Sequence, residues 1–414
     1  MPATNKAKPT HCEMSQFETS GDQLVINHVP ISQLCDRVGQ TPFYAYDRSV
    51  IANNIHQLRE QFNSLANLHY AIKANPMSAL VDFISPLVDG LDVASGKELT
   101  VALNSGISPS KISFAGPGKQ SQELLMAIAA GVTINVESAI ELERIMRICD
   151  SSNYAANIAL RVNPDFDLKA SGMKMAGGAQ QFGIDAEKIA QLTPQLQHEK
   201  INLKGLHIFT GSQNLKSEAI QAAHNNIFEL AAKLSEQLNC SLDHLNIGGG
   251  FGIPYFPGET PLDLPPIADN LAKLRKAYQK QFSTTEIILE LGRYLVGNAG
   301  VYITRVIDIK QSRGENFVIV DGGLHHHLSA SGNFGQVIRK NYPVKIANKI
   351  NQTQSQTATI TGPLCTPLDL LAKNMQFPEI EIGDLVAVFQ SGAYGFTASP
   401  RDFLSHPQPI EVLV

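Results

Sequence analysis

The sequence lacks the features that mark several specialised classes of protein. Its five cysteines form no C-x-x-C pair, which argues against a disulfide scaffold and a zinc site. The net charge of −5 provides no basic field for nucleic acid. No apolar run reaches the roughly 18 residues of a membrane span, and the polar N-terminus has no secretion signal. We therefore expect a cytoplasmic protein with no nucleic-acid or membrane partner.

The composition is that of an ordinary globular protein, with 43% hydrophobic and 17% charged residues over 414 positions. At about 150 residues per domain, this length predicts two or three domains. Residues 1–20 have the character of a loose tail, and residues 23–45 are predicted to form a strand, a helix and a second strand.

Eight short apolar runs alternate with amphipathic helical patterns. The runs are 68–73, 91–95, 112–116, 132–138, 158–163, 203–209, 242–249 and 286–292. This alternation predicts parallel strands joined by helical crossovers. Eight such units in about 250 residues predict an α/β fold of the (β/α)8 barrel type. An open doubly wound sheet has the same alternation and is the alternative.

The pattern changes near residue 300, where period-2 alternation and polar turns become dominant. One short helix is expected at 368–374. We predict a C-terminal antiparallel β domain that the N-terminal strand joins. The expected domains are an N-terminal segment at 1–40 joining the β domain, a barrel at 41–295 and the β domain at 296–414.

Active sites of such barrels lie at the carboxyl ends of the strands. Lys73 ends the first run among apolar neighbours, where a desolvated amine can form a Schiff base, although most lysines are solvated. The seventh run ends in a glycine-rich loop, 248–252, that could bind an anion or be a flexible turn. The eighth ends in Glu290-Leu291-Gly292-Arg293, which suits a basic ring nitrogen and a phosphate. An ion pair between Glu290 and Arg293 is the alternative. Together these motifs point to pyridoxal phosphate.

With these motifs, the chain resembles the fold-type III pyridoxal 5'-phosphate-dependent decarboxylases of diaminopimelate, ornithine and arginine. The resemblance extends from about residue 38 to the C-terminus. It is carried in order by YAIKAN, LDVASGKEL, RVNP, FGI, GLHIFTGSQ, LNIGGGFG, ELGR, DGG, GPLC and SGAYG. It implies the alanine racemase-like fold, a barrel followed by a β domain, and a homodimer with shared active sites.

The resemblance also implies roles for individual residues. Lys73 would form the internal aldimine, Glu290 would pair with the pyridinium nitrogen, and the partner subunit would contribute Cys365. This thiol would reprotonate the α-carbon after a quinonoid intermediate; a buried structural thiol is the alternative. The other implied cofactor-binding residues are Asp92, Arg161, His207, Phe209, Ser212, Gly249, Gly250, Gly292, Arg293 and Tyr394. The implied substrate-binding residues are Thr366, Asp369 and Tyr394.

Three positions depart from the family pattern. Phe209 replaces a histidine that stacks on the cofactor, and His207 would point the same way from a strand. Thr366 replaces the acid that receives the distal amine of the substrate, which argues against a free diamino acid unless Asp369 substitutes. Ser329 stands near the position of an arginine that grips the carboxylate of diaminopimelate.

The segments GLHIFTGSQNL, GPLCTPLDLL and VFQSGAYGFTASP resemble a subgroup that includes exosortase-associated and carrier-protein-dependent decarboxylases. We therefore expect decarboxylation of an L- or meso-amino acid, free or bound to an acyl carrier protein. The alternatives are diaminopimelate decarboxylation in lysine biosynthesis, amino-acid racemisation and a non-catalytic regulatory role. Three consecutive histidines, His325 to His327, are not expected to bind a metal, because neighbouring strand residues face opposite sides.

Overall fold

The computed structural model describes residues 9–166, 173–174 and 176–414. These residues divide into two compact units. The barrel unit contains Ala52–Ile253 and Leu262–Leu295. The β unit contains the described residues up to Ile51, together with Pro254–Pro261 and Val296–Val414. The first eight residues of the expected N-terminal tail lie outside the described residues.

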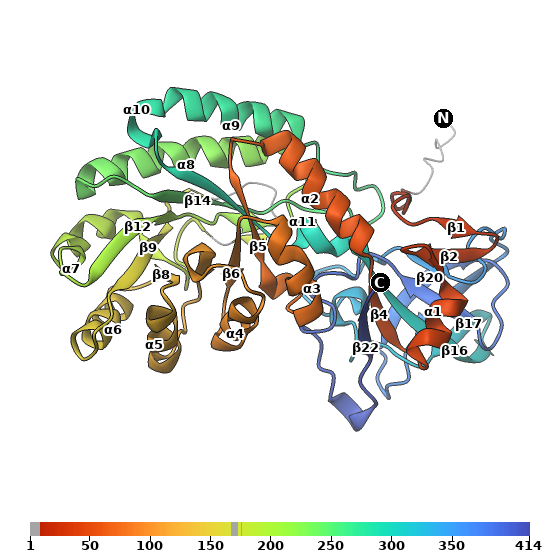
Figure 1. Ribbon diagram of the computed structural model, residues 1–414. Helices are drawn as coiled ribbons and strands as arrows, with labels where there is room; N and C mark the ends of the chain where they lie inside the picture. The colour runs from red at the N-terminus through yellow and green to blue at the C-terminus, as the bar shows by residue number, and fades with distance from the viewer. Residues whose placement is uncertain (1–8, 167–172, 175) are drawn as a thin grey trace. The chain divides into compact units, whose positions relative to one another are not determined.

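The barrel unit is a closed ring of parallel strands (Figure 1). Each of the eight apolar runs forms one strand. The strands are β5 (Asn67–Ala71), β6 (Gly90–Val93), β7 (Ile112–Phe114), β8 (Thr133–Val136), β9 (Ala156–Asn163), β12 (Ile201–His207), β14 (His244–Gly249) and β15 (Glu286–Leu291). The ring closes because β8 pairs with β9 and β15 pairs with β5. The predicted barrel is confirmed, and the open sheet is wrong.

Helices lie on the outside of these strands (Figure 1). The main ones are α2 (Arg48–Phe62), α3 (Ser78–Ile84), α4 (Gly96–Asn104), α5 (Ser121–Ala130), α6 (Ala139–Asp150), α8 (Ser217–Leu238) and α9 (Pro265–Ala277). The side chains of Ser95 and Ser138 cap α4 and α6 by accepting backbone N–H groups of Glu98 and Glu141. These caps start each helix soon after its strand, so the short connecting loops remain at the carboxyl ends of the strands.

The β unit is built around a long strand, β16 (Gly300–Ser312). The other strands of its eight-stranded sheet are β4 (Phe43–Tyr46), β17 (Glu315–Val320), β18 (Val344–Ile346), β19 (Gln356–Thr361), β20 (Leu370–Phe377), β21 (Leu385–Val388) and β22 (Ile410–Leu413). A separate three-stranded sheet contains β1 (Thr19–Ser20), β2 (Gln23–Ile26) and β3 (Val29–Pro30). The pairs β17–β19 and β4–β22 are parallel, and the remaining pairs are antiparallel. The sheet is therefore mixed, whereas a purely antiparallel one was expected.

Two boundaries differ from the sequence-based expectation. The segment 368–374, expected as a helix, contributes to strand β20, because β19 offers an antiparallel partner along its whole length. Tertiary pairing here overrides local propensity. The second difference concerns the start of the barrel, expected at residue 41. Strand β4 pairs with β16 and β22 and belongs to the β unit, so the barrel unit begins at Ala52.

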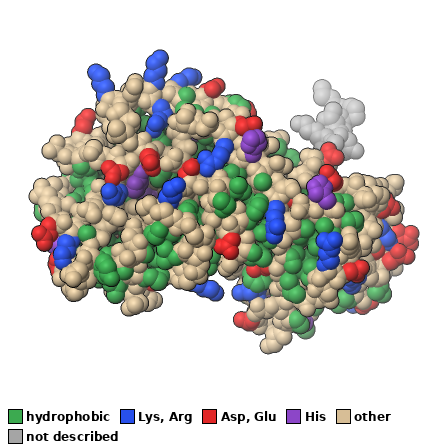
Figure 2. All heavy atoms as spheres, viewed as in Figure 1, with side chains coloured by type: hydrophobic (Ala, Val, Ile, Leu, Met, Phe, Trp, Pro, Cys, Tyr) green, Lys and Arg blue, Asp and Glu red, His purple; other side chains and the backbone are tan. Residues whose placement is uncertain are grey.

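The surface carries charges of both signs. On the face shown in Figure 2, Lys and Arg side chains are interspersed with Asp and Glu. Among the described helices, none combines the length and the apolar character that a membrane span requires.

Candidate active site

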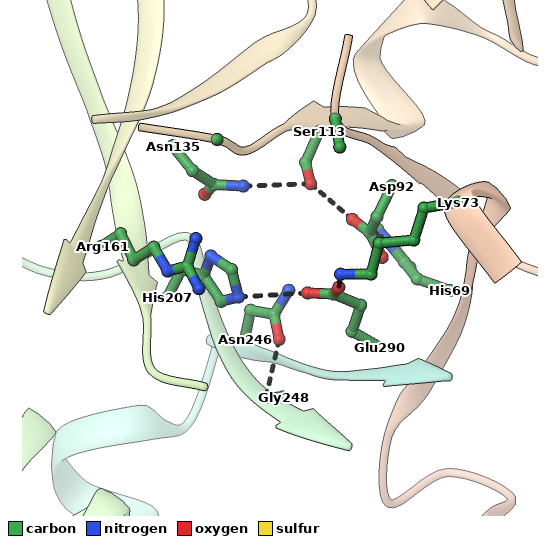
Figure 3. Close-up of polar contacts among 12 residues, drawn as sticks. His69, Lys73, Asp92, Ser113, Asn135, Arg161, His207, Asn246, Gly248 and Glu290 are labelled. Carbon is green, nitrogen blue, oxygen red and sulfur yellow. Dashed lines mark hydrogen bonds and ion pairs between the residues drawn. The ribbon is translucent and has the colours of Figure 1, made fainter. Parts of the chain in front are cut away.

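The carboxyl ends of the barrel strands bring together the lysine and the carboxylate expected from sequence (Figure 3). Lys73 lies in a short 3-10 helix, Ile72–Ala74, directly after β5, and Glu290 lies on the neighbouring strand β15. The Nζ atom of Lys73 is 3.2 Å from Oε1 of Glu290. The side chain of Glu290 is 5% exposed and that of Lys73 is 41% exposed. The pair thus joins a buried acid to an accessible amine.

A second group contacts the other oxygen of Glu290. The Nε2 atom of His207, at the end of β12, lies 3.0 Å from Oε2 (Figure 3). Burial alone would raise the pKa of Glu290, but Lys73, His207 and Arg161 outweigh it and hold the pKa well below its ordinary value. Glu290 is therefore a carboxylate that stays ionised in a buried place.

Phe209 also lies at this site. The Nζ atom of Lys73 is 5.5 Å from the centroid of its ring. His207 and Phe209 thus both lie near the Lys73–Glu290 pair, and their contacts differ: His207 contacts the carboxylate, while the ring of Phe209 lies beside the amine.

Arg161 is held by a buried acid that the sequence analysis missed. Its Nη1 atom lies 2.8 Å from Oε1 of Glu137, which directly follows β8. Burial would raise the pKa of Glu137, but Arg161 and Lys119 outweigh it and lower the pKa. The guanidinium also lies over the ring of Phe182, 4.9 Å from its centroid. Glu137 could have been found by the same strand-end rule that identified Lys73.

Asp92 belongs to a polar network inside the barrel (Figure 3). Its Oδ1 atom lies 3.3 Å from Nδ1 of His69 and accepts a short hydrogen bond from the hydroxyl of Ser113. Asn135 donates to the same hydroxyl at 3.2 Å. Burial would lower the pKa of His69, but Asp92 raises it above the ordinary value. The sequence signal for His69, Ser113 and Asn135 is a single polar residue within each apolar strand.

The glycine-rich loop after β14 has a conformation that side chains would obstruct. Gly248 and Gly250 have φ values of +70° and +74°, in the left-handed region. A Cβ atom on Gly249 would lie 2.2 Å from the carbonyl oxygen of Glu290, and one on Gly292 would lie 2.9 Å from that of Ala71. The backbone N–H of Gly248 donates to the side chain of Asn246 at 2.8 Å, which fixes the start of the loop.

The segment after Ser212 is joined to this loop. The N–H of Asn214 donates to the carbonyl of Gly250, and the N–H of Gly252 donates to the carbonyl of Asn214, both at 2.9 Å. Ser212 itself lies in β13 (Gly211–Ser212), two residues before Asn214. Arg293 begins α11 (Arg293–Val296) directly after β15. The predicted phosphate-binding residues of the barrel unit thus lie at or after the carboxyl ends of β12, β14 and β15.

The remaining predicted residues lie in the β unit. All five cysteines are described, and Cys365 is the exposed one, so the buried-thiol alternative for it is wrong. The carboxylate of Asp369 is buried and accepts N–H groups of Leu324 at 2.6 Å and Leu364 at 2.9 Å. Burial raises its pKa, and the two hydrogen bonds oppose this rise only in part. Asp369 thus fastens the turn that carries Cys365 and Thr366, instead of projecting from it.

Tyr394 and Ser329 are joined to each other. The hydroxyl of Ser329 donates to the carbonyl oxygen of Tyr394 at 3.0 Å. Tyr394 has a φ of +55°, which is uncommon for a residue with a side chain and is typical of strained functional positions. The buried hydroxyl of Ser329 is therefore engaged in holding a strained backbone.

The three histidines have an arrangement that the sequence analysis did not predict. Residues 324–326 form a turn and not a strand, so the rings of His325 and His326 approach to 3.7 Å between centroids. His327 donates to or accepts from the hydroxyl of Ser391 at 2.8 Å. In the part of the chain that the structure describes, no group of three His, Cys, Asp or Glu side chains could hold a metal ion.

A family model matches the chain over residues 48–297, more than half of its length. Its description is pyridoxal-dependent decarboxylase, pyridoxal binding domain. The matched segment contains every strand of the barrel and the whole cluster around Glu290.

Individual relatives cover almost the entire chain. The L-glutamyl-[BtrI acyl-carrier protein] decarboxylase of Niallia circulans is 38% identical, over 90% of this chain and 89% of its own. The diaminopimelate decarboxylase of Archaeoglobus fulgidus is 34% identical, over 96% and 93%. Among solved structures, the diaminopimelate decarboxylase of M. jannaschii has a TM-score of 0.88 at 26% identity, covering 96% of this chain and 92% of that one.

Proposed function

Because the chain belongs to the pyridoxal-dependent decarboxylases, we propose that it removes the α-carboxyl group of an amino acid that an acyl carrier protein holds as a thioester. The α-carboxyl must be free to leave as CO2, so the thioester must involve a second carboxyl, on the side chain. The substrate class is then a dicarboxylic amino acid such as glutamate. The relative that acts on such a carrier-bound amino acid is 38% identical.

The residues of the barrel unit fit pyridoxal phosphate. Lys73 offers an accessible amine, Glu290 offers a buried ionised carboxylate, and the loop 248–252 offers backbone that a Cβ atom would obstruct. When bound, the cofactor supplies a ring that accepts the electrons left behind by CO2. These three features match its aldehyde, its ring nitrogen and its phosphate.

Each residue of the cluster has a proposed task. Lys73 holds the cofactor through its amine, and Glu290 keeps a proton on the ring nitrogen. His207 holds the second oxygen of Glu290, so that the first is aimed at that nitrogen. Asp92 and Arg161 line the cofactor site from strands β6 and β9. Phosphate binding is assigned to the following residues: Ser212, Gly249, Gly250, Gly292, Arg293 and Tyr394.

Proton return to the α-carbon is assigned to Cys365. It is an exposed thiol on a turn that Asp369 fastens, so it is both accessible and positioned. In the proposed homodimer it completes the active site of the partner subunit. A thiol with an accessible proton is a suitable general acid for a carbanion.

The burial of Asp369 is the observation that supports a carrier-bound substrate. A free diamino acid presents a distal ammonium, which needs a carboxylate partner when it is buried. Residues 362–368 contain no acid, and both oxygens of Asp369 already accept backbone N–H groups. Thr366 and the buried Ser329 are neutral. A thioester, which is also neutral, matches such surroundings better.

Decarboxylation of free diaminopimelate is the second candidate, because several relatives and solved structures carry that name. Racemisation and a non-catalytic role find less support, since the matched family and these relatives are decarboxylases.

A decarboxylation screen by mass spectrometry tests the proposal. The holoenzyme is given free meso-diaminopimelate, lysine, ornithine, arginine and glutamate, and then the L-glutamyl thioester of a carrier protein. We expect CO2 loss from the thioester and little from the free amino acids. Rapid turnover of free diaminopimelate would contradict the proposal.

A further inference from the structure

Asp92 is a buried carboxylate whose two oxygens have different surroundings. The side chain is 5% exposed. Its Oδ1 atom lies 3.3 Å from Nδ1 of His69 and accepts the short hydrogen bond from Ser113. Its Oδ2 atom is also buried, and no group among the described residues hydrogen-bonds to it. A buried acceptor without a partner is costly, so this oxygen is one that a bound molecule can satisfy.

The direction of the hydrogen bonds favours an ionised Asp92 (Figure 3). The side-chain amide of Asn135 donates to the oxygen of Ser113 at 3.2 Å, which leaves the one proton of that hydroxyl for Asp92. Nδ1 of His69 contacts the same carboxylate oxygen. Donors that converge on one oxygen suit a carboxylate, because a neutral carboxyl group would have to carry its own proton on the partnerless Oδ2.

Asp92 lies on the strand next to Lys73. Its Cα partner across β5 and β6 is Ala71, two residues before Lys73. Strand β6 also contacts the short helix Ile72–Ala74 that carries Lys73. In the proposed function Glu290 serves the ring nitrogen of the cofactor. Asp92 is then a second acid for a nitrogen bound near the end of β5.

His69 has the surroundings of a protonated histidine. Burial would lower its pKa, but Asp92 on β6, Glu290 on β15 and Asp89, directly before β6, outweigh burial and raise it. The ring also lines a cavity of about 300 Å³ at the amino ends of the barrel strands. Besides Asp89, the other charged or titratable groups that line this cavity are Lys111, His244 and Glu286.

A glycine makes room for the imidazole. Gly90 is the Cα partner of His69, and a Cβ atom at Gly90 would collide with Nε2 and Cε1 of the ring. Gly90 lies inside strand β6 and has no left-handed backbone conformation. Space for the ring, and not conformational freedom, is therefore what glycine provides here. The contact between His69 and Asp92 depends on this space.

We propose that His69 is a positioning residue: with Ser113 and Asn135 it keeps Asp92 as a carboxylate whose second oxygen accepts a proton-bearing nitrogen of the bound cofactor or amino acid. The inference rests on the proposed place of Asp92 in the cofactor site and adds the group that controls its charge. His69 acts through Asp92, because a neutral carboxyl group could not stabilise a positive charge on that nitrogen.

Three variants of the holoenzyme separate this role from a structural one. His69→Gln can keep a hydrogen bond to Asp92 but carries no charge. His244→Gln is the matched control, because His244 lines the same cavity but burial lowers its pKa to about 4, so it is neutral near pH 7. Ser113→Ala removes the other donor and provides a second test of the same carboxylate.

Infrared spectroscopy measures the charge of Asp92 without substrate. Difference spectra between pH 8 and pH 5 detect carboxylates that take up a proton, and subtraction of the Asp92→Asn spectrum isolates Asp92. We expect His69→Gln to move the titration midpoint of Asp92 upward by about one pH unit or more, since a nearby cation is lost. Ser113→Ala should move it less in the same direction, and His244→Gln should leave it unchanged.

The pH dependence of kcat/KM tests whether this charge is used. It is measured over the same pH range on the L-glutamyl thioester of a carrier protein and on free meso-diaminopimelate. For His69→Gln, we expect the acid limb to move upward with the infrared midpoint, so that kcat/KM falls about tenfold at low pH. At pH 8 it should stay within about threefold of the wild type.

The possible failures can be told apart. An infrared midpoint that is the same in His69→Gln and wild type would overturn the role of His69. A kcat/KM that falls equally at every pH would make His69 a structural residue. A shifted midpoint with an unshifted acid limb would refute the place of Asp92 in the cofactor site, and the role of His69 with it. Failure of the wild type on both substrates would refute the proposed function, while the infrared comparison still decides whether His69 controls Asp92.

Discussion

Glu290 in the barrel unit and Asp369 in the β unit are both buried carboxylates, but their surroundings are opposite. Glu290 has Lys73 and His207 on its two oxygens, and its pKa is lowered. Asp369 has two backbone N–H groups, and its pKa is raised. Burial opposes ionisation in both places, and only nearby cations overcome it. A buried acid among cations is therefore suited to hold charge for chemistry, whereas one among backbone amides is suited to hold a loop.

The largest effect should come from removing the charge at the barrel site. Glu290→Gln keeps the shape of the side chain but cannot hold a proton on the cofactor ring. We expect kcat to fall by about 10²–10³-fold, as for the loss of one preorganised electrostatic group. Cofactor content should change much less, because Lys73 and the glycine loop remain. Steady-state kinetics and the absorbance of bound cofactor measure the two quantities. A kcat within tenfold of the wild type would contradict the proposal that Glu290, unlike Asp369, holds its charge for catalysis.

The corresponding change in the β unit should act on stability first. Asp369→Asn replaces one acceptor by an NH2 group that faces a backbone N–H, and a buried group then loses its hydrogen bond. We expect a loss of about 1–3 kcal/mol in the free energy of unfolding, measured by urea titration. Glu379→Gln, at an exposed acid of the same unit, is the control and should change little. The comparison fails if Asp369→Asn has wild-type stability.

Acid should destabilise the protein through its buried histidines. Burial lowers the pKa of His325 and His327 to about 3 in the β unit, and that of His224 and His244 to about 4 in the barrel unit. The unfolded chain binds these protons below about pH 6.5, so stability is present above that pH and is lost as the pH falls towards 4.

Replacement of one buried histidine tests this dependence. His327→Gln can keep a hydrogen bond to Ser391 but takes up no proton on unfolding. We expect the drop in the urea midpoint between pH 7 and pH 5 to be smaller in the variant than in the wild type. An unchanged drop would show that His327 is already protonated in the folded protein.

The smallest effect should come from the aromatic face beside Lys73. Phe209→His restores the residue that the family usually has and keeps a flat ring at the same place. We expect kcat to change by less than about tenfold, because stacking contributes roughly 0.5–1.5 kcal/mol. Steady-state kinetics across pH 6–9 measure it. A loss of more than a hundredfold would mean that Phe209 has a role no histidine can fill.

The sequence predicted the barrel better than the β unit, and the reason is physical. Parallel strands buried on both faces are continuous apolar runs, and the strand-end rule then located Lys73 and Glu290. The segment 368–374 was misread because strand β20 depends on pairing with β19, which no local pattern records. Asp369 was assigned to the substrate because sequence alone does not show that Leu324 and Leu364 occupy its oxygens. The rule that active-site residues lie at the carboxyl ends of barrel strands also predicts Glu137, which directly follows β8.

We propose that the acid-free turn 362–368, which carries Cys365, selects a carrier-bound amino acid. The most direct test is a competition in one vessel between the L-glutamyl thioester of a carrier protein and free meso-diaminopimelate at equal concentration. The ratio of the two products, measured by mass spectrometry, equals the ratio of kcat/KM values. We predict that the decarboxylated thioester exceeds lysine by at least about a hundredfold, since a buried ammonium without a carboxylate is costly. An excess of lysine would contradict the claim.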